Sequence, residues 1–428
     1  MPTADTRRAS PGADRAARAA AEAVARRSYG KLVALLAART RDVTAAEDAL
    51  AEAFAAALVA WPAQGVPRSP EGWLSTVARR KWIDAARRRR RAEEAGGHLR
   101  LLADELAAAA GEGRALPDER LPLLFACAHP ALDPGVRAPL ILQAVLGFDA
   151  ATIGSAFLVP PATMSQRLVR AKRKIRDAGI PFHVPEGADV AARLDAVLDA
   201  IHAAFAMGGA EPAGAALERR NLAGDAIWLG RLVVSLLPEE PEALGLLARM
   251  LYARSRWRAE RDAAGAYVPL AEQDPAAWDA AAIEEAEALL ARARALPGPD
   301  GHHRLAAAVE AAHAARRHTG RTDWPAIARL YDALLPRAGS PAVAVERALA
   351  RAEVYGPPAG LAALDALAGD PRVAGYPPYW AARAGLLARA HETGRALAAY
   401  GRAIGLERDP AVRRFFERRR SETARRNP

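Results

Sequence analysis

At 428 residues the chain is longer than an ordinary domain, so we expect two or three domains, each with its own core. Its single cysteine, Cys127, excludes an internal disulfide framework and a zinc site made of several cysteines, as expected in the reducing cytoplasm. No run of about 18 residues is apolar and uncharged, which argues against a membrane-spanning helix and a secretory signal.

The whole chain has a net charge of +10, and its positive charge is concentrated in the first part. Residues 1–186 hold 28 Lys and Arg against 20 Asp and Glu, whereas residues 187–428 hold 32 against 30. A basic segment of this kind is typical of a protein that binds a polyanion such as nucleic acid. An arginine-rich composition could give the same excess without that function, so charge alone leaves both interpretations open.

The apolar residues recur at helical spacing, and alternating runs rich in Val, Ile and Thr are missing, which predicts an all-α protein. Stretches rich in glycine and proline divide it. The predicted order is a disordered N-terminus at 1–12, a helical domain at 13–91, a linker at 92–117, a second helical domain at 118–185, an α-solenoid-like helical-repeat domain at 190–420 and a disordered tail at 421–428.

The first domain is predicted to hold four helices, at 13–27, 29–39, 44–61 and 70–91. Thr44 with Glu47 three residues later is the capping-box pattern, so we expect Thr44 to be the N-cap of the third helix. The fourth helix interleaves tryptophans with basic residues, and bases that leave a duplex need stacking rings and a basic track. This segment therefore predicts strand opening. Alternatively, Trp73 and Trp82 belong to the core, and the arginines at 87–91 are a solvated helix end.

Residues 136–176 have the pattern of a helix-turn-helix. An apolar helix at 136–148 is followed by a short helix with Asp149 as N-cap, a tight connection at 158–161 and a third helix. In the third helix one predicted buried face comprises Met164, Leu168, Ala171 and Ile175. A helix fits the major groove of DNA, where its first residues meet base edges and later basic residues lie near phosphates.

The third helix therefore supplies candidate DNA contacts. The base-reading candidates are Thr163, Ser165, Gln166 and Arg167, and the phosphate-binding candidates are Arg170, Lys172, Arg173 and Lys174. The alternative is a basic amphipathic surface helix, or one that contacts RNA or polymerase.

The C-terminal part is predicted to consist of stacked helical hairpins, because glycine and proline interrupt its helical pattern at intervals. One unit is close to a tetratricopeptide register, with packing positions at Trp380, Ala384, Leu387, Ala396, Tyr400 and Ala403, although Arg383 departs from it. Elsewhere, Cys127 and His129 could form a thiol or metal site, but a buried cysteine beside a turn is the simpler interpretation. No known catalytic motif occurs, so we expect no enzyme activity, no metal and no cofactor.

With these motifs in order, the chain resembles an extracytoplasmic-function RNA polymerase sigma factor, of the subgroup with a C-terminal tetratricopeptide-like extension. The resemblance is carried by EDALAEAF and EGWLSTVARRKWIDAARR in region two and by DAATIGSAFLVPPATMSQRLVRAKRKIR in region four. TDWPAIARLYDALL and GPPAGLAALDAL resemble the extension.

The resemblance implies a dissociable initiation subunit that binds the clamp helices and flap of core RNA polymerase and then promoter DNA. The implied polymerase-docking residues are Glu47, Asp48, Leu50, Glu52 and Phe54. The implied minus-ten contacts are Trp61, Arg68, Arg79, Arg80, Lys81, Trp82, Arg87 and Arg88, and the helix that begins near Thr163 would lie at the minus-thirty-five element. A regulatory protein could bind the extension.

Two other functions fit parts of the same pattern. An autonomous helix-turn-helix regulator with a helical-repeat sensor domain would bind duplex DNA without polymerase. A helical-repeat scaffold with incidental basic charge would need neither Arg167 nor Arg170. The docking pattern and the separate tryptophan-arginine segment favour the sigma factor, because a repressor needs neither.

Overall fold

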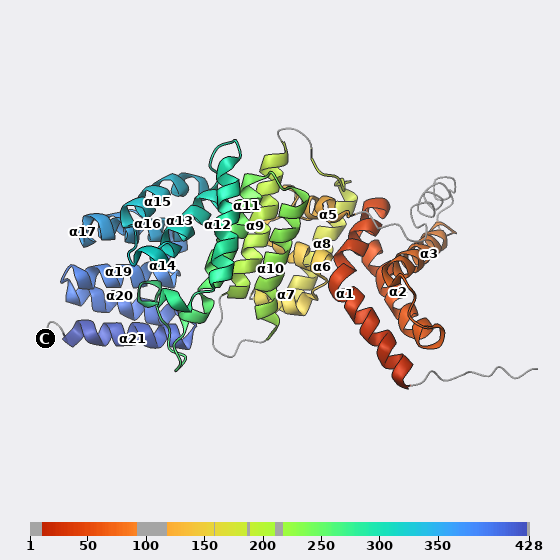
Figure 1. Ribbon diagram of the computed structural model, residues 1–428, viewed down its shortest axis with the longest axis horizontal. Helices are drawn as coiled ribbons and strands as arrows, with labels where there is room; N and C mark the ends of the chain where they lie inside the picture. The colour runs from red at the N-terminus through yellow and green to blue at the C-terminus, as the bar shows by residue number, and fades with distance from the viewer. Residues whose placement is uncertain (1–10, 92–117, 158, 186–188, 210–216, 426–428) are drawn as a thin grey trace, which may run out of the picture. The chain divides into compact units, whose positions relative to one another are not determined.

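The computed structural model describes residues 11–91, 118–157, 159–185, 189–209 and 217–425 (Figure 1). These residues form helices and, apart from one isolated bridge between Arg261 and Tyr267, no β structure, which confirms the all-α prediction. They divide into two compact units, residues 1–204 (unit 1) and 205–428 (unit 2). The predicted linker at 92–117 lies outside the described residues.

Unit 1 is built from α1 (Pro11–Thr40), α2 (Val43–Gln64), α3 (Pro70–Arg91), α5 (Arg120–Cys127), α6 (Pro134–Leu146), α7 (Ala150–Ala156), α8 (Pro161–Asp177) and most of α9 (Asp189–Gly209). Two predicted boundaries are wrong. α1 continues through Ser28, whose hydroxyl donates to the Glu71 carboxylate of α3. The N-cap of α2 is Asp42, which accepts from the Ala45 amide at 3.1 Å, and not Thr44.

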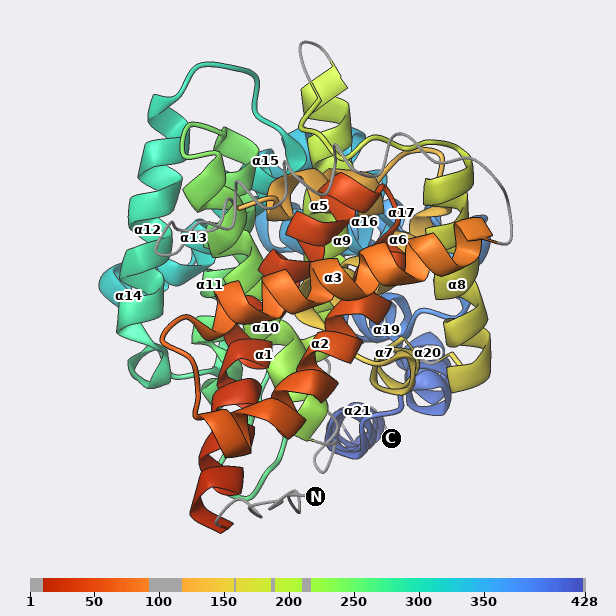
Figure 2. The same cartoon turned by 90° about the vertical axis from the view of Figure 1, so that its right-hand side faces the viewer.

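The first three helices form a bundle in which α3 lies across α1 and α2 (Figure 2). Leu32 of α1, Leu50 of α2 and Leu74 of α3 are completely buried. Burial of one such leucine contributes about 1.5–3 kcal/mol. Because this core occupies one face of α2, the opposite face is left for other contacts.

α1 also packs against α5 and α6 of the second predicted domain. A Cβ atom at Gly30 would lie 2.0 Å from the Val145 carbonyl oxygen, so this close approach requires glycine. Two residues beyond Val145, the C-cap of α6 is Gly147 with φ 77°, where a Cβ would meet the ring of Tyr29. The two predicted helical domains therefore pack together within unit 1.

Replacing Gly30 with alanine tests this packing. We expect Gly30→Ala to lower the free energy of unfolding of unit 1 by about 1–3 kcal/mol, because the new methyl group forces two backbones apart. The control is Gly224→Ala on an exposed position of α10 (Leu217–Leu236), where a Cβ meets nothing within 4 Å, so that change is neutral or stabilises by up to about 1 kcal/mol. Calorimetric unfolding of the full chain measures both variants. Equal melting temperatures of the two variants would contradict the close contact between Gly30 and Val145.

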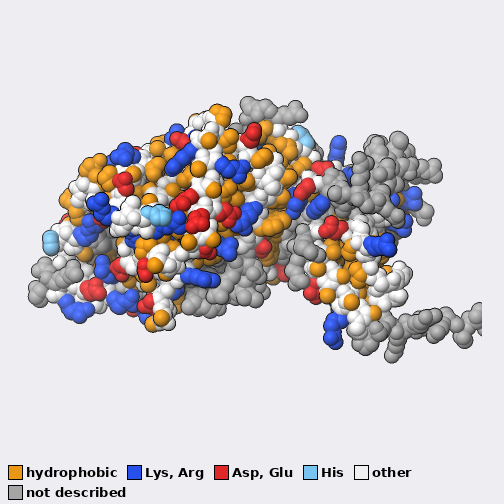
Figure 3. Space-filling model, viewed as in Figure 1, with side chains coloured by type: hydrophobic (Ala, Val, Ile, Leu, Met, Phe, Trp, Pro, Cys, Tyr) orange, Lys and Arg blue, Asp and Glu red, His pale blue; other side chains and the backbone are white. Residues whose placement is uncertain are grey.

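Unit 2 stacks helices along the rest of the chain. After α10 come α11 (Pro241–Ser255), η1 (Trp257–Glu260), η2 (Leu270–Glu272), η3 (Pro275–Ala277), α12 (Ala280–Ala295), α13 (His302–Ala314), α14 (Arg316–Thr319), α15 (Trp324–Ala338), α16 (Pro341–Tyr355), α17 (Pro357–Asp365), α18 (Pro371–Ala374), α19 (Pro377–Arg389), α20 (Thr393–Leu406) and α21 (Pro410–Arg425). Successive long helices pack in pairs, as predicted for helical hairpins. Basic and acidic side chains are interspersed on the face of unit 2 seen in Figure 3.

The hairpin α19–α20 confirms most of the predicted packing positions. Ala384, Leu387, Ala396, Tyr400 and Ala403 are all buried. The large residue that is buried at the start of the hairpin is Tyr379. The neighbouring Trp380 is half-buried, and the Arg402 guanidinium lies over it, 4.5 Å from the centre of the Trp380 ring. The side chain one position earlier therefore fills the core.

Two boundaries in the C-terminal part differ from the prediction. The compact units divide inside α9, after Ala204, and not before residue 190. α21 remains helical to Arg425, so the predicted disordered tail at 421–428 is wrong for its described residues. Phe416 anchors α21 in the core of the α19–α20 hairpin, which explains why the highly charged segment after it stays helical. No helix in the described ranges has both the length and the apolar character to cross a bilayer.

Candidate nucleic-acid interface

Residues 134–177 fold as the predicted three successive helices, α6, α7 and α8. Asp149 caps α7 as expected, since its carboxylate accepts from the Thr152 amide at 2.7 Å. A Cβ atom at Gly154 would lie 2.7 Å from the Val159 carbonyl oxygen, and the Val159 amide donates back to Gly154 at 2.8 Å. Glycine at this position therefore permits the tight connection that sets α7 against α8.

The buried face of α8 is the one predicted, because Met164, Leu168, Ala171 and Ile175 are all buried. The exposed side chains are Thr163, Ser165, Gln166, Arg167, Arg170, Arg173, Lys174 and Arg176. Within the described part of the chain, four of these cations make no ion pair with an acid: Arg167, Arg170, Arg173 and Lys174. α8 therefore carries a row of uncompensated positive charge along its outer side.

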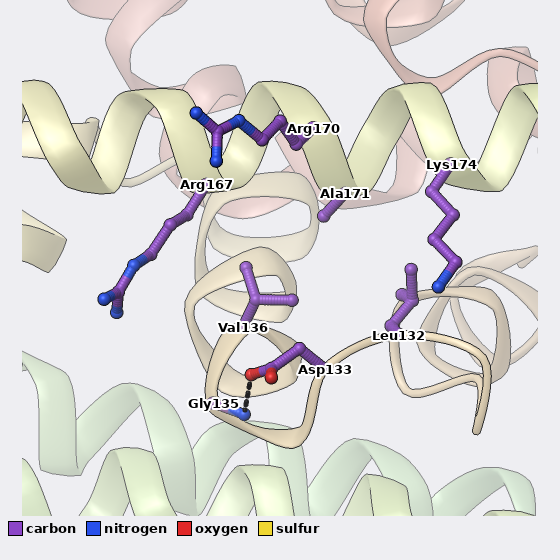
Figure 4. A pocket seen from close by; sticks show the side chains of 8 residues that line it. All are labelled: Leu132, Asp133, Gly135, Val136, Arg167, Arg170, Ala171 and Lys174. Atoms are coloured by element: carbon purple, nitrogen blue, oxygen red, sulfur yellow. Dashed lines mark hydrogen bonds between the residues drawn. The ribbon is translucent and has the colours of Figure 1, made fainter.

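A hollow of about 400 Å³ lies between α8 and the start of α6 (Figure 4). Arg167 and Lys174 extend from α8 on either side of Val136, and Arg170 contributes to the same wall. The carboxylate of Asp133 accepts from the Gly135 amide at 2.8 Å and so serves as the cap of α6. The exposed cations that line this hollow form a surface suited to phosphate groups.

Lys172 is the exception on α8, because it is buried and forms an ion pair with Glu47 of α2. A guanidinium nitrogen of Arg176 lies 3.8 Å from a carboxylate oxygen of Asp42, the N-cap of α2. Burial raises the pKa of the Glu47 carboxyl, against the opposing effect of the Lys172 ammonium. Loss of hydration therefore has a larger effect on the pKa of this carboxyl than the nearby ammonium has. In this arrangement neither side chain faces a partner molecule.

Lys172→Gln should loosen the contact between α2 and α8. The variant leaves the Glu47 carboxylate partly buried without its cation, which we expect to cost about 1–3 kcal/mol. Hydrogen exchange of the α2 and α8 amides should accelerate accordingly. Adding Glu47→Gln should restore slow exchange, since neither charge is then left unpaired. Additive effects of the two changes would show that the pair does not hold the helices together.

α2 presents a mixed acidic and apolar outer face. Of the residues predicted to dock polymerase, Asp48 and Glu52 are exposed, Phe54 and Glu47 are partly buried, and Leu50 is completely buried in the bundle core. Leu58 and Val59, which sequence reasoning missed, are 47% and 79% exposed in the following turns. The sequence did contain a signal for them, because they are two adjacent apolar residues in a helix whose buried face is made mostly of alanines. Exposed apolar side chains beside acids are typical of a protein-binding surface.

The tryptophan-arginine segment contributes exposed cations but few exposed rings. Trp61 is buried and contacts Trp73 edge to face at 5.5 Å, so both rings belong to the bundle rather than to its surface. Trp82 and Arg79 are partly buried, and Lys81 lies 3.5 Å from Glu52. The exposed cations of the predicted set are Arg68, Arg80 and Arg87. The side chain of Arg88 lies outside the described residues.

The thiol of Cys127 is completely buried, and burial raises its pKa to about 12. It therefore stays protonated and unreactive at neutral pH. The neighbouring His129 accepts a hydrogen bond from the Ala131 amide at 3.1 Å. These contacts agree with the interpretation of a buried cysteine beside a turn.

Unit 1 therefore has two surfaces of different chemistry, the row of cations on α8 and the acidic and apolar face of α2. Comparison with known proteins specifies the class, since residues 24–92 match the family Sigma-70 region 2. Residues 193–294 match a family of unknown function (DUF6596). An uncharacterised protein of Rhizobium meliloti (strain 1021) is 40% identical over 374 residues, which cover 86% of this chain and 87% of the relative.

The region 2 match supports a sigma factor of RNA polymerase. Sigma factors are initiation subunits that do not themselves catalyse RNA synthesis, and region 2 implies interaction with core polymerase and promoter DNA. No solved structure matches the chain.

Proposed function

We propose that this chain is a sigma factor of the extracytoplasmic-function type, in which a C-terminal helical-repeat domain has been added to regions two and four. The observation that carries the proposal is the pairing of two different surfaces in unit 1. One is the acidic and apolar face of α2, and the other is the row of unpaired cations on α8. A repressor would need only the second.

In this proposal α2 binds the clamp helices of the polymerase largest subunit. Asp48 and Glu52 supply charge complementarity, and Leu58 and Val59 supply apolar area. Glu47 joins them once its contact with Lys172 has opened. The exposed Arg68, Arg80 and Arg87 then lie along the minus-ten strand.

The same proposal places α8 in the major groove at the minus-thirty-five element. Thr163, Ser165, Gln166 and Arg167 are exposed near the start of α8, where side chains reach base edges. Arg170, Arg173 and Lys174 continue along the outer side toward the phosphates, with the hollow beside α6 as a phosphate seat. Lys172 contributes to DNA binding only after it separates from α2.

The helical-repeat domain is proposed to regulate the factor by binding a partner in the cytoplasm. A covalently attached regulator acts at a high effective concentration, so it needs little intrinsic affinity. The α19–α20 hairpin, with small and large residues buried at alternating helical positions, supports a tetratricopeptide-like packing.

The proposal is tested with purified chain, core polymerase and a promoter library. We expect the chain to bind core polymerase and to yield transcripts with defined start sites. Specific binding of duplex DNA by the chain alone, with no binding to core polymerase, would support an autonomous regulator instead. A gel-shift assay at moderate salt separates the two outcomes.

A further inference from the structure

Unit 2 contains a cavity of about 190 Å³ that belongs to neither proposed interface. It lies among η2, α13, α14, α15 and α16. Its size is below the roughly 300–1,000 Å³ of pockets for drug-sized ligands, so it suits a single head group or a short side chain. The polar groups that line it decide which chemistry it accepts.

Glu346 of α16 is the acid of this cavity. Its residue is exposed to solvent, while desolvation by the surrounding protein and the nearby Glu310 raise the pKa of its carboxyl to about 7. In the part of the chain that the structure describes, the Glu346 carboxylate makes no hydrogen bond and no ion pair. Elsewhere in unit 2 many carboxylates are paired, as Glu310 is with Arg256 at 2.5 Å.

Arg316 also lines the cavity, but its guanidinium is held by contacts other than Glu346. The guanidinium of Arg316 stacks on Trp278 with 5.1 Å to the ring centre, and it donates to the carbonyl oxygens of Ala271 at 3.1 Å and Gln273 at 2.6 Å. Burial lowers the pKa of His313, so its imidazole is neutral at neutral pH. Glu346 is therefore left without a counter-ion from the protein.

Aromatic rings complete the walls. Trp324 and Tyr331 of α15 line the cavity beside Glu346, and the ring of His313 holds Trp324 edge to face at 5.6 Å. Aromatic faces attract cations by about 0.5–2 kcal/mol, and more when water is excluded. A carboxylate together with aromatic walls is the usual environment for binding an organic cation.

We propose that this cavity binds a small organic cation, an alkylammonium or alkylguanidinium group, with Glu346 as its counter-ion and Trp324 and Tyr331 as its walls. The group could belong to a free amine or to a lysine or arginine side chain of a protein partner. Such a site would let the helical-repeat domain respond to a ligand, independently of whether unit 1 acts as a sigma factor.

Calorimetric titration of the full chain with butylguanidinium tests the proposal at mildly alkaline pH, where the Glu346 carboxyl is ionised. We expect saturable binding, weakened at least about tenfold by Glu346→Gln, which removes the charge and keeps the shape. The matched control is Glu284→Gln on α12, an exposed position outside the cavity, which should leave binding unchanged.

A second probe makes the test independent of variant folding. Butylurea has nearly the same shape as butylguanidinium and no charge, so the wild-type chain should bind it at least about tenfold more weakly. Equal binding of the two probes, or of butylguanidinium to the wild type and Glu346→Gln, would overturn the proposal, as would no binding at all. A blocked peptide with one arginine identifies the source of the cation: tighter binding than butylguanidinium indicates a protein partner, and weaker binding a free amine.

Discussion

Val59→Asp is expected to weaken binding to core RNA polymerase by about ten- to one-hundredfold, a loss of about 1.4–3 kcal/mol. Val59 is 79% exposed on α2, so its loss does not disturb the core of unit 1. In the proposed complex it is buried against the polymerase, where a carboxylate would lose its hydration without gaining a partner. Fluorescence anisotropy of labelled chain titrated with core polymerase measures the change.

The control places the same charge on a different exposed apolar side chain. Tyr355 is 65% exposed at the end of α16, and Tyr355→Asp should leave the affinity for core polymerase unchanged. Melting curves of both variants should match the wild type. If Val59→Asp binds core polymerase as well as Tyr355→Asp does, the outer face of α2 is not the docking surface.

The second large effect concerns α8. In complex with core polymerase, Arg167→Ala should weaken binding to promoter duplex by about 1–3 kcal/mol and relax the preference for one base pair of the minus-thirty-five element. Arg170→Ala should weaken binding to all sequences alike and reduce the slope of log affinity against log salt by about one. Both side chains are exposed and line the hollow in Figure 4.

Arg408→Ala, an exposed arginine of unit 2, is the control for nonspecific loss of positive charge. It should leave promoter affinity and its salt dependence unchanged. If all three arginine variants behave alike, α8 does not lie on DNA, and the cationic row serves another purpose. Gel-shift titrations at several salt concentrations distinguish these results.

Local sequence patterns predicted the faces of α8 because they depend only on helical periodicity. Met164, Leu168, Ala171 and Ile175 recur on one stripe, and all four are buried. Lys172 could not be placed in this way, because its burial depends on Glu47, which lies 125 residues earlier in the chain. A lysine beside a buried stripe is ordinarily exposed, and only the packing of α8 against α2 reverses that expectation.

Errors at the ends of helices have a similar cause. Thr44 and Asp42 are both suitable caps, and only the actual hydrogen bond from the Ala45 amide selects Asp42. Ser28 resembles a helix break in the sequence, yet its hydroxyl finds a partner in Glu71 of another helix. Trp61 is among the implied minus-ten contacts but is buried against Trp73. For Ser28 and Trp61 a contact between helices outweighed a local preference, whereas the choice of Asp42 over Thr44 is local.

The cavity around Glu346 could not be predicted from the sequence. Its lining residues come from several separate segments between Leu270 and Leu349, and no spacing within any one of them indicates a shared site. The tetratricopeptide-like register predicted which residues of α19 and α20 are buried, because a repeat reuses one local contact pattern. It carries no information on where a ligand binds.

The most direct test of the sigma factor assignment is transcription in vitro with core polymerase, using the wild-type chain, Val59→Asp and Arg167→Ala. We expect the wild type to direct transcripts from defined start sites. Val59→Asp should give fewer of them at the same concentration because it binds core polymerase more weakly, and Arg167→Ala should give fewer while binding core polymerase as the wild type does. A wild-type chain that neither binds core polymerase nor alters its start sites would contradict the account.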